Sequence, residues 1–229
     1  MLSRVLEPEV MDTAEEAADY DSMDHGEVNA KFCADLLAVR SGIRGSVLDV
    51  GTGTALIPIE LCKRTPNVDV IAIDLAEHML DLGRRNVTSA GLDARVRLDK
   101  IDAKAMPYAD GQFGATISNS IVHHIPDPRA VLAEMWRVTA AGGVLFVRDL
   151  SRPDSAQEVD RLVELYGGDP PADPTKRESY ARQKGLFHAS LCAALTVSEV
   201  AAIVASFGIP QDAVRATSDR HWTLAFVKP

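Results

Sequence analysis

The sequence predicts an α/β fold, in which a mostly parallel sheet of seven strands carries helices on both faces. Three observations support this prediction. Short apolar runs alternate with amphipathic stretches from Ser46 onward, as in chains that form parallel sheets. The first run ends in a glycine-rich turn that leads directly into a helix. The last two runs are joined by a short polar turn, which predicts an antiparallel pair at the C-terminus.

Five apolar runs are the expected strands of the parallel part. They span residues 47–50, 68–73, 95–98, 113–118 and 144–147. Each run has the length of a strand and is bounded by polar or turn-forming residues. Two further runs, 213–217 and 221–227, are separated by Ser218-Asp219-Arg220 and form the predicted C-terminal hairpin.

Helix boundaries follow from capping residues and glycines. Apolar residues recur at helical spacing between positions 28 and 39, and Gly42 is expected to end that helix. Asp127-Pro128 provides an N-cap and a first-turn proline for a crossover helix, which Gly142-Gly143 is expected to end.

Two capping boxes predict helices in the last third of the chain. Thr175-x-x-Glu178 follows a loop rich in glycine and proline, and Thr196-x-x-Glu199 precedes an apolar helical face that Gly208 is expected to end. The length of 229 residues suits one domain. We divide it into an N-terminal helical cap (1–45), a core carrying the glycine-rich turn (46–150), a helical insertion (151–195) and a C-terminal helix with hairpin (196–229).

Composition and charge narrow the classes of function. The net charge of −9 repels phosphate backbones on average, which disfavours nucleic acid as a substrate. No apolar run approaches membrane-spanning length, and residues 1–10 lack the basic-then-apolar order of a secretory signal. We therefore expect a cytoplasmic protein that binds no membrane. The three cysteines lie far apart without a CxxC pair, which argues against both a disulfide framework and a zinc site.

The strongest indication of function is Asp49-x-Gly51-x-Gly53, which lies between an apolar strand and a helix. Glycine allows the sharp turn and the close approach of a ligand, and the N-terminus of the helix offers unpaired N–H donors. An ordinary tight turn is the alternative interpretation. Asp74 ends the second strand, where a nucleotide ribose would lie, although it equally suits a helix N-cap.

Two nucleotide classes fit this arrangement. The dinucleotide motif Gly-x-Gly-x-x-Gly would need a third glycine at position 56, which is Leu56 here. This substitution argues against an NAD-dependent oxidoreductase. Over about residues 45–150 the chain resembles class I S-adenosylmethionine-dependent methyltransferases. The resemblance rests on four motifs at the ends of successive strands: Asp49-x-Gly51-x-Gly53, Asp74, Asp102-Ala103 and Ser118-Asn119.

The resemblance implies a Rossmann-like fold with an antiparallel C-terminal strand and S-adenosylmethionine as cofactor, with S-adenosylhomocysteine as product. It implies that Asp49, Gly51 and Gly53 surround the methionine part and that Asp74 binds the ribose. The adenine would contact Leu75, Asp102 and Ala103, and Asn119 would lie near the sulfonium. Two residues depart from the family pattern: Ala55 replaces a third glycine, and Gly114 replaces a frequent aspartate.

The stretch 118–128 resembles small-molecule methyltransferases, including quinone-type enzymes, and lacks the Asn-Pro-Pro-aromatic motif of amino-methylating nucleic-acid enzymes. We therefore predict an enzyme that methylates a small molecule, with an NAD-dependent oxidoreductase or a non-catalytic S-adenosylmethionine-binding domain as alternatives. The identity of the acceptor and the oligomeric state, of which a homodimer is one option, stay open.

Three residues are candidates for catalysis. Histidine ordinarily titrates near neutral pH, so His123 or His124 could assist deprotonation of an acceptor, as could Tyr20. Tyr20 lies in an N-terminal stretch that could fold over the cofactor. A structural role for at least one histidine, and a solvated helix face around Tyr20, are the alternatives. Adjacent histidines rarely supply a complete metal site, and no Glu or Cys stands at ligand spacing nearby, so we expect no metal.

Overall fold

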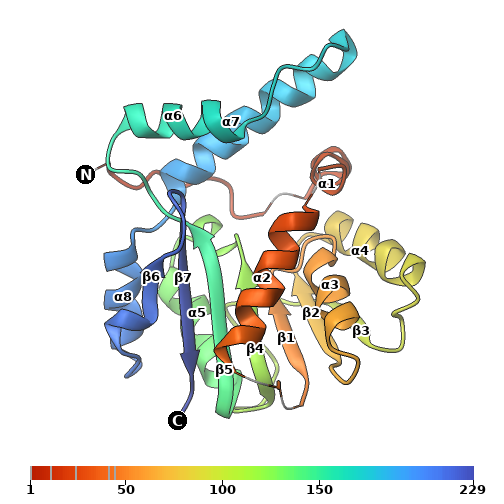
Figure 1. Ribbon diagram of the computed structural model, residues 1–229, viewed down its shortest axis with the longest axis vertical. Helices are drawn as coiled ribbons and strands as arrows, with labels where there is room; N and C mark the ends of the chain where they lie inside the picture. The colour runs from red at the N-terminus through yellow and green to blue at the C-terminus, as the bar shows by residue number, and fades with distance from the viewer. Residues whose placement is uncertain (1, 11, 24, 41, 44) are drawn as a thin grey trace.

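A seven-stranded sheet forms the centre of the protein (Figure 1). The computed structural model describes residues 2–10, 12–23, 25–40, 42–43 and 45–229. Its strands lie in the order β3-β2-β1-β4-β5-β7-β6, and β7 is antiparallel to both of its neighbours whereas β1 to β5 pair in parallel. The strands are β1 (Val47–Val50), β2 (Val70–Asp74), β3 (Val96–Lys100), β4 (Phe113–Asn119), β5 (Thr139–Leu150), β6 (Val214–Ala216) and β7 (His221–Val227). The predicted fold class is confirmed.

Helices cover both faces and the carboxyl end of the sheet (Figure 1). No helix of the described residues is long and apolar enough to span a bilayer. The α-helices are α1 (Ala14–Asp21), α2 (Gly26–Val39), α3 (Leu56–Arg64), α4 (Glu77–Ser89), α5 (Pro128–Val138), α6 (Ala156–Tyr166), α7 (Arg177–Ala193) and α8 (Val197–Ala205). Three short 3-10 turns are η1 (Val122–His124), η2 (Pro174–Lys176) and η3 (Gln211–Ala213).

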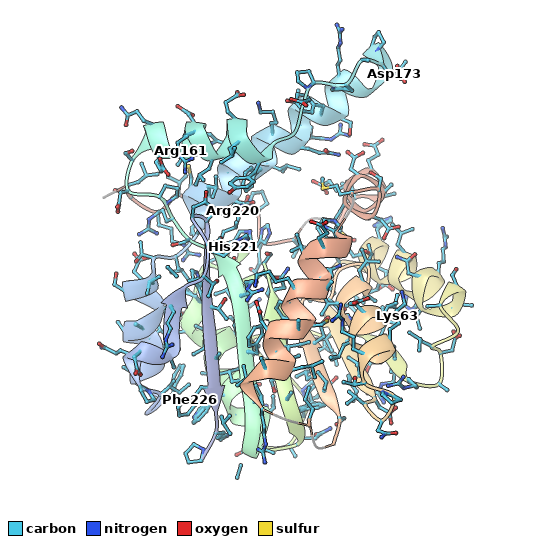
Figure 2. All side chains as sticks on the ribbon, in the orientation of Figure 1. Lys63, Arg161, Asp173, Arg220, His221 and Phe226 are labelled. Carbon is cyan, nitrogen blue, oxygen red and sulfur yellow. The ribbon has the colours of Figure 1, made fainter. Side chains whose placement is uncertain are left out.

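Two apolar clusters hold these helices on the sheet. On one face, Phe32 of α2 packs edge to face against Phe146 of β5, with ring centroids 5.0 Å apart. On the other face, α5 and α8 pack over β4, β5 and the hairpin, where Trp222 of β7 is fully buried. Figure 2 marks the two ends of β7 by His221, near the carboxyl ends of the parallel strands, and Phe226.

The N-terminal segment, residues 2–10, runs along α7 at the carboxyl end of the sheet (Figure 1). The backbone N–H of Val5 donates to the carbonyl of Cys192 at 3.0 Å, and Arg4 Nε donates to the carbonyl of Ala193 at 2.7 Å. Helices α6 and α7 pack on each other through their own apolar cluster, which Leu2 joins. The start of the chain is thereby attached to its last third.

Two predicted helix boundaries are wrong. Gly142-Gly143 does not end the crossover helix, because α5 ends at Val138 and residues 139–150 already form β5. The pairing of β4 with β5 shifts register between Phe113 and Ala115, and a Cβ on Gly143 would lie 2.8 Å from the Ala140 carbonyl oxygen. The two glycines therefore allow an irregularity in β5.

The capping box predicted at Thr175 is also wrong. Asp173 caps the 3-10 turn that precedes α7, and its carboxylate accepts the backbone N–H of Thr175. The box at Thr196 is confirmed, with Glu199 at the third helical position. A further box, Thr13 with Glu16, begins α1 and was not predicted.

We predict that Phe146→Ala lowers the free energy of unfolding by about 3–5 kcal/mol, because it opens a cavity between α2 and the sheet. Phe146 is 1% exposed. Chemical denaturation at constant pH measures the loss. The control is Val227→Ala at the exposed end of β7, which should change stability by less than about 0.5 kcal/mol. Equal effects of the two substitutions would contradict the packing argument.

Candidate active site

A cleft of about 880 Å³, including space open to solvent, lies where β1, β2 and β4 end. Ligands of open α/β sheets bind at this edge of the sheet. Residues of the loops after β1 to β4 line the cleft, and the N-terminal segment and α1 contribute to it as well. The lining includes Glu9, Val10, Tyr20, Gly51, Gly53, Asp74, Leu75, Asp102, Ala103, Asn119, Ser120, Ile121, His124 and Ile125.

The turn after β1 requires glycine. Gly51 has a φ of +73°, and a Cβ there would lie 2.1 Å from Cγ2 of Ile121. The N–H groups of Gly51 and Thr52 both donate to the carbonyl of Ile73. The third family position, Ala55, is left-handed with a φ of +63°, a conformation that costs an alanine roughly 1–2 kcal/mol. The turn thus brings bare backbone to the cleft.

Asp74 fixes this turn from the end of β2. Its Oδ2 accepts the backbone N–H of Gly53 at 2.8 Å, and its Oδ1 accepts that of Ala76 at 3.0 Å. Burial raises the pKa of Asp74, while these backbone donors act in the opposite direction. Helix α4 begins one residue beyond Ala76, so Asp74 supports the approach to the helix and faces the cleft as well.

Asp49 lies deeper, at the base of the same edge. It lines a smaller adjoining pocket with Thr52, Thr54 and Asn119, and its side chain is 2% exposed. Within the described part of the chain, its Oδ2 has no hydrogen-bond partner. Burial raises the pKa of Asp49 to about 7. Burial outweighs a hydrogen bond from the Thr52 side chain, which acts to lower this pKa. A buried carboxyl oxygen without a partner favours a cationic or hydrogen-donating group beside it.

Tyr20 and Asn119 border both pockets. Tyr20 as a whole is 36% exposed, but desolvation of its phenol, reinforced by the charges of Asp49 and Asp74, raises its pKa to about 12. The phenol therefore keeps its proton at neutral pH and can donate a hydrogen bond. Asn119 ends β4 and is followed by Ser120, whose φ of +60° is unusual for a residue other than glycine.

The two predicted histidines have different surroundings. His124 lines the cleft, and burial, together with the neighbouring His123, lowers its pKa to about 4. His123 is 3% exposed and lies away from the cleft, with its Nδ1 2.5 Å from Oδ1 of Asp149. Burial opposes the charged form of His123, but Asp149 outweighs burial and raises the pKa. Only His124 is placed to meet a ligand in the cleft.

Leu75, Asp102 and Ala103, predicted to contact the adenine, line the cleft on the side of β3. Asp102 accepts the N–H of Lys104, and the ammonium of Lys104 pairs with both Asp102 and Glu9. Sequence reasoning missed Glu9 and Val10, because no spacing links them to the strand ends. It also missed Ser120, whose backbone conformation leaves no trace in the sequence.

Comparison with known proteins finds similarity to methyltransferases. Residues 47–143, which contain β1 to β4 and their loops, match the family described as methyltransferase domain. Over these residues the chain is similar to methyltransferase domains. One similar relative is the ubiquinone/menaquinone biosynthesis C-methyltransferase UbiE of Dinoroseobacter shibae, 41% identical over 52% of this chain and 46% of that protein.

A second relative is a demethylmenaquinone methyltransferase of Deinococcus radiodurans, 38% identical over 48% of this chain and 44% of that protein. The chain therefore matches about half the length of these relatives. Among solved structures, a SAM-dependent methyltransferase from Aquifex aeolicus superposes with a TM-score of 0.63 at 19% identity, covering 94% of this chain and 98% of the other. That likeness extends the fold beyond the matched residues.

S-adenosylmethionine, the cofactor of this family, fits the residues present. The bare backbone at Gly51 and Gly53 allows close approach, and Asp74 at the end of β2 offers carboxylate oxygens to a ribose. The unpartnered Oδ2 of Asp49 provides an acceptor for an ammonium group or a negative charge beside a cation. The geometry and the electrostatics of the cleft thus suit a cationic nucleoside.

We predict that Asp49→Asn stabilises the ligand-free protein at pH 8. The folded pKa of about 7 lies above the ordinary 3.8, so the folded state binds this proton more tightly than the unfolded state. The contribution of Asp49 to stability therefore falls as pH rises from about 4 to 7, by on the order of 4 kcal/mol at most. Because asparagine cannot ionise, the Asp49→Asn protein does not lose this stability as the pH rises.

Unfolding free energies of both proteins at pH 4 and pH 8 test the prediction. The advantage of Asp49→Asn should be present at pH 8 and small at pH 4. Asp69→Asn, which alters an exposed carboxylate before β2, should show no such difference. A pH-independent effect of Asp49→Asn would mean that the buried carboxyl does not titrate in this range.

Proposed function

We propose that this chain transfers a methyl group from S-adenosylmethionine to a small-molecule acceptor bound in the cleft. One observation carries the proposal: the glycine turn, Asp74 and the unpartnered Oδ2 of Asp49 meet at one sheet edge beside a cleft open to solvent. In this proposal Asp49, Gly51 and Gly53 hold the methionine part. Asp74 binds the ribose hydroxyls, and Asn119 lies near the sulfonium.

The adenine in this proposal lies against Leu75, Asp102 and Ala103. Support comes from their common position on the cleft wall beyond Asp74, on the side of β3. Asp102 is tied to Lys104 by its Oδ1, which accepts the N–H of Lys104 at 2.8 Å. The loop after β3 is therefore positioned without the ligand, which lowers the ordering cost of binding.

The acceptor would occupy the side formed by the N-terminal segment and the loop after β4. Val10, Ile121 and Ile125 make this wall largely apolar, and Glu9 and His124 are its polar groups. An apolar wall with few polar groups suits a small organic molecule. The net charge of −9 further disfavours nucleic acid. Quinone-type acceptors, which the names of the relatives indicate for those proteins, are the first class to screen.

Positioning would supply most of the catalysis. When bound, the cofactor would supply an activated methyl group. Its thioether leaving group would need no proton from an acid. The chain then has to hold an acceptor atom in line with it, which Asn119, Tyr20 and the apolar wall would do. Tyr20 would act as a hydrogen-bond donor. His124 is the candidate for assisting an acceptor that must lose a proton, and His123 would only position the loop.

We predict that S-adenosylmethionine and S-adenosylhomocysteine bind with micromolar affinity and that NAD does not. The cleft offers one carboxylate, that of Asp74, to a ribose, and the turn has Leu56 where the dinucleotide motif requires its third glycine. Isothermal calorimetry with the three ligands decides this. Labelled methyl transfer to an acceptor panel then separates an enzyme from a non-catalytic binding domain. Tight NAD binding without a response to S-adenosylhomocysteine would overturn the assignment.

We predict that Asp74→Asn weakens S-adenosylhomocysteine binding at least tenfold. The substitution removes charge-assisted hydrogen bonds to the ribose, each worth roughly 1.5–3 kcal/mol. Asp81→Asn is the matched control on the exposed face of α4, where the side chain is 57% exposed. Unchanged affinity in folded Asp74→Asn would show that Asp74 serves only the backbone of Gly53 and Ala76.

A further inference from the structure

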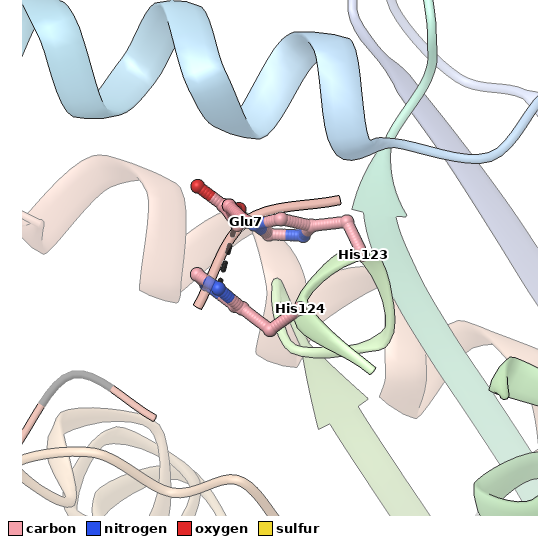
Figure 3. Close-up of side chains that lie close together, drawn as sticks. All are labelled: Glu7, His123 and His124. Carbon is pink, nitrogen blue, oxygen red and sulfur yellow. Dashed lines mark ion pairs between the residues drawn. The ribbon is translucent and has the colours of Figure 1, made fainter. Parts of the chain in front are cut away.

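Three side chains with metal-binding atoms meet at the edge of the cleft. Glu7 comes from the N-terminal segment, and His123 and His124 come from the 3-10 turn η1 after β4 (Figure 3). Their potential ligand atoms all lie within 4.8 Å of one another. Glu7 is separated from the two adjacent histidines by more than one hundred positions in the sequence, so only the fold brings it to them.

Two of the three spacings between these atoms are close to those of a tetrahedral site, and the third is at most 4.8 Å. Two ligand atoms bound to zinc at about 2.0–2.1 Å stand roughly 3.3–3.4 Å apart. Glu7 Oε1 lies 3.2 Å from His124 Nδ1 and 3.5 Å from His123 Nε2. The two histidine rings lie with their centroids 4.1 Å apart. A cation therefore fits between the three atoms with small side-chain movements.

Two of the three atoms lack a hydrogen bond. Glu7 Oε1 and His124 Nδ1 are both buried and lie 3.2 Å from each other, but neither makes a hydrogen bond among the residues that the structure describes. The Glu7 side chain is only 7% exposed. Burial of such groups costs free energy unless a partner satisfies them. Two buried atoms that face each other without a hydrogen bond point to a ligand that accepts a lone pair from each of them, which a metal ion does.

Further residues hold the ligand atoms in place. The Asp149 carboxylate lies 2.5 Å from His123 Nδ1 and fixes the proton there, which leaves the lone pair of Nε2 directed away from Asp149. Ser190 of α7 donates to Oε2 of Glu7 at 3.2 Å, which leaves Oε1 facing the histidines. A carboxylate behind a metal-binding histidine is the usual arrangement in such sites.

We propose that Glu7, His123 and His124 bind a divalent zinc ion. Two imidazoles and one carboxylate are a ligand set that zinc prefers, and magnesium and calcium prefer sites made of oxygen alone. Three protein ligands leave one coordination position beside the cleft that His124 lines, as in zinc sites that exchange water or substrate. The ion would also bind the N-terminal segment to the loop after β4.

Zinc titration of the full chain, after treatment with a chelator, tests the proposal. Competition against a chromophoric chelator should give one Zn²⁺ per chain, and Glu7→Gln and His124→Asn should each weaken binding at least tenfold. Glu164→Gln and His188→Asn are matched controls on α6 and α7, with side chains 79% and 49% exposed. Both controls should keep the wild-type affinity.

A second measurement uses wild-type protein only. Co²⁺ in place of zinc should give the visible d–d absorption of a four- or five-coordinate site, and Zn²⁺ should raise the midpoint of thermal unfolding. Absence of stoichiometric zinc, or unchanged affinity in both ligand variants, would overturn the proposal. So would loss of binding in His188→Asn, which would locate the ion at the surface near Cys192, or a preference for Mg²⁺ over Zn²⁺.

Discussion

One buried carboxylate, that of Asp149 in β5, holds the loop that forms a wall of the cleft. Its Oδ2 accepts the N–H groups of Val122 at 2.6 Å and His123 at 3.3 Å, and its Oδ1 lies 2.5 Å from the His123 ring. The side chain is fully buried, yet His123 outweighs desolvation and lowers the pKa of Asp149. Removal of this charge would leave several buried donors without an acceptor, which is costly. The positions of Ile121 and His124 therefore depend on Asp149.

The glycine turn depends on a second carboxylate in the same way. Asp74 accepts the N–H of Gly53 and so ties the end of β2 to the turn after β1. Asp49 and Asp74 are both desolvated, and each raises the pKa of Tyr20. The protein thus concentrates negative charge at the sheet edge at a cost to its own stability. Such a cost is expected where a site is preorganised for a positively charged ligand.

Much of this arrangement could be predicted from the sequence, because the parallel strands and their loops carry local patterns. The glycine turn, Asp74 and Asn119 all lie at strand ends and meet there by topology alone. The helix boundary at Gly142 was wrong because the same glycines permit an irregular strand, and local patterns do not separate the two cases. His123 and His124, equivalent in the sequence, differ because one ring faces Asp149 and the other faces the cleft.

The N-terminal segment shows why the remainder could not be predicted. Residues 2–10 include no helix or strand, so they leave no periodic pattern, and their position rests on contacts with residues near 190. Arg4 donates to the carbonyls of His123 and Ala193, and Lys104 pairs with Glu9, so the segment links the loops after β3 and β4 to α7. No Glu or Cys stands at ligand spacing near the histidines in the sequence. Only the tertiary contacts bring Glu7, the third residue of the proposed zinc site, close to them.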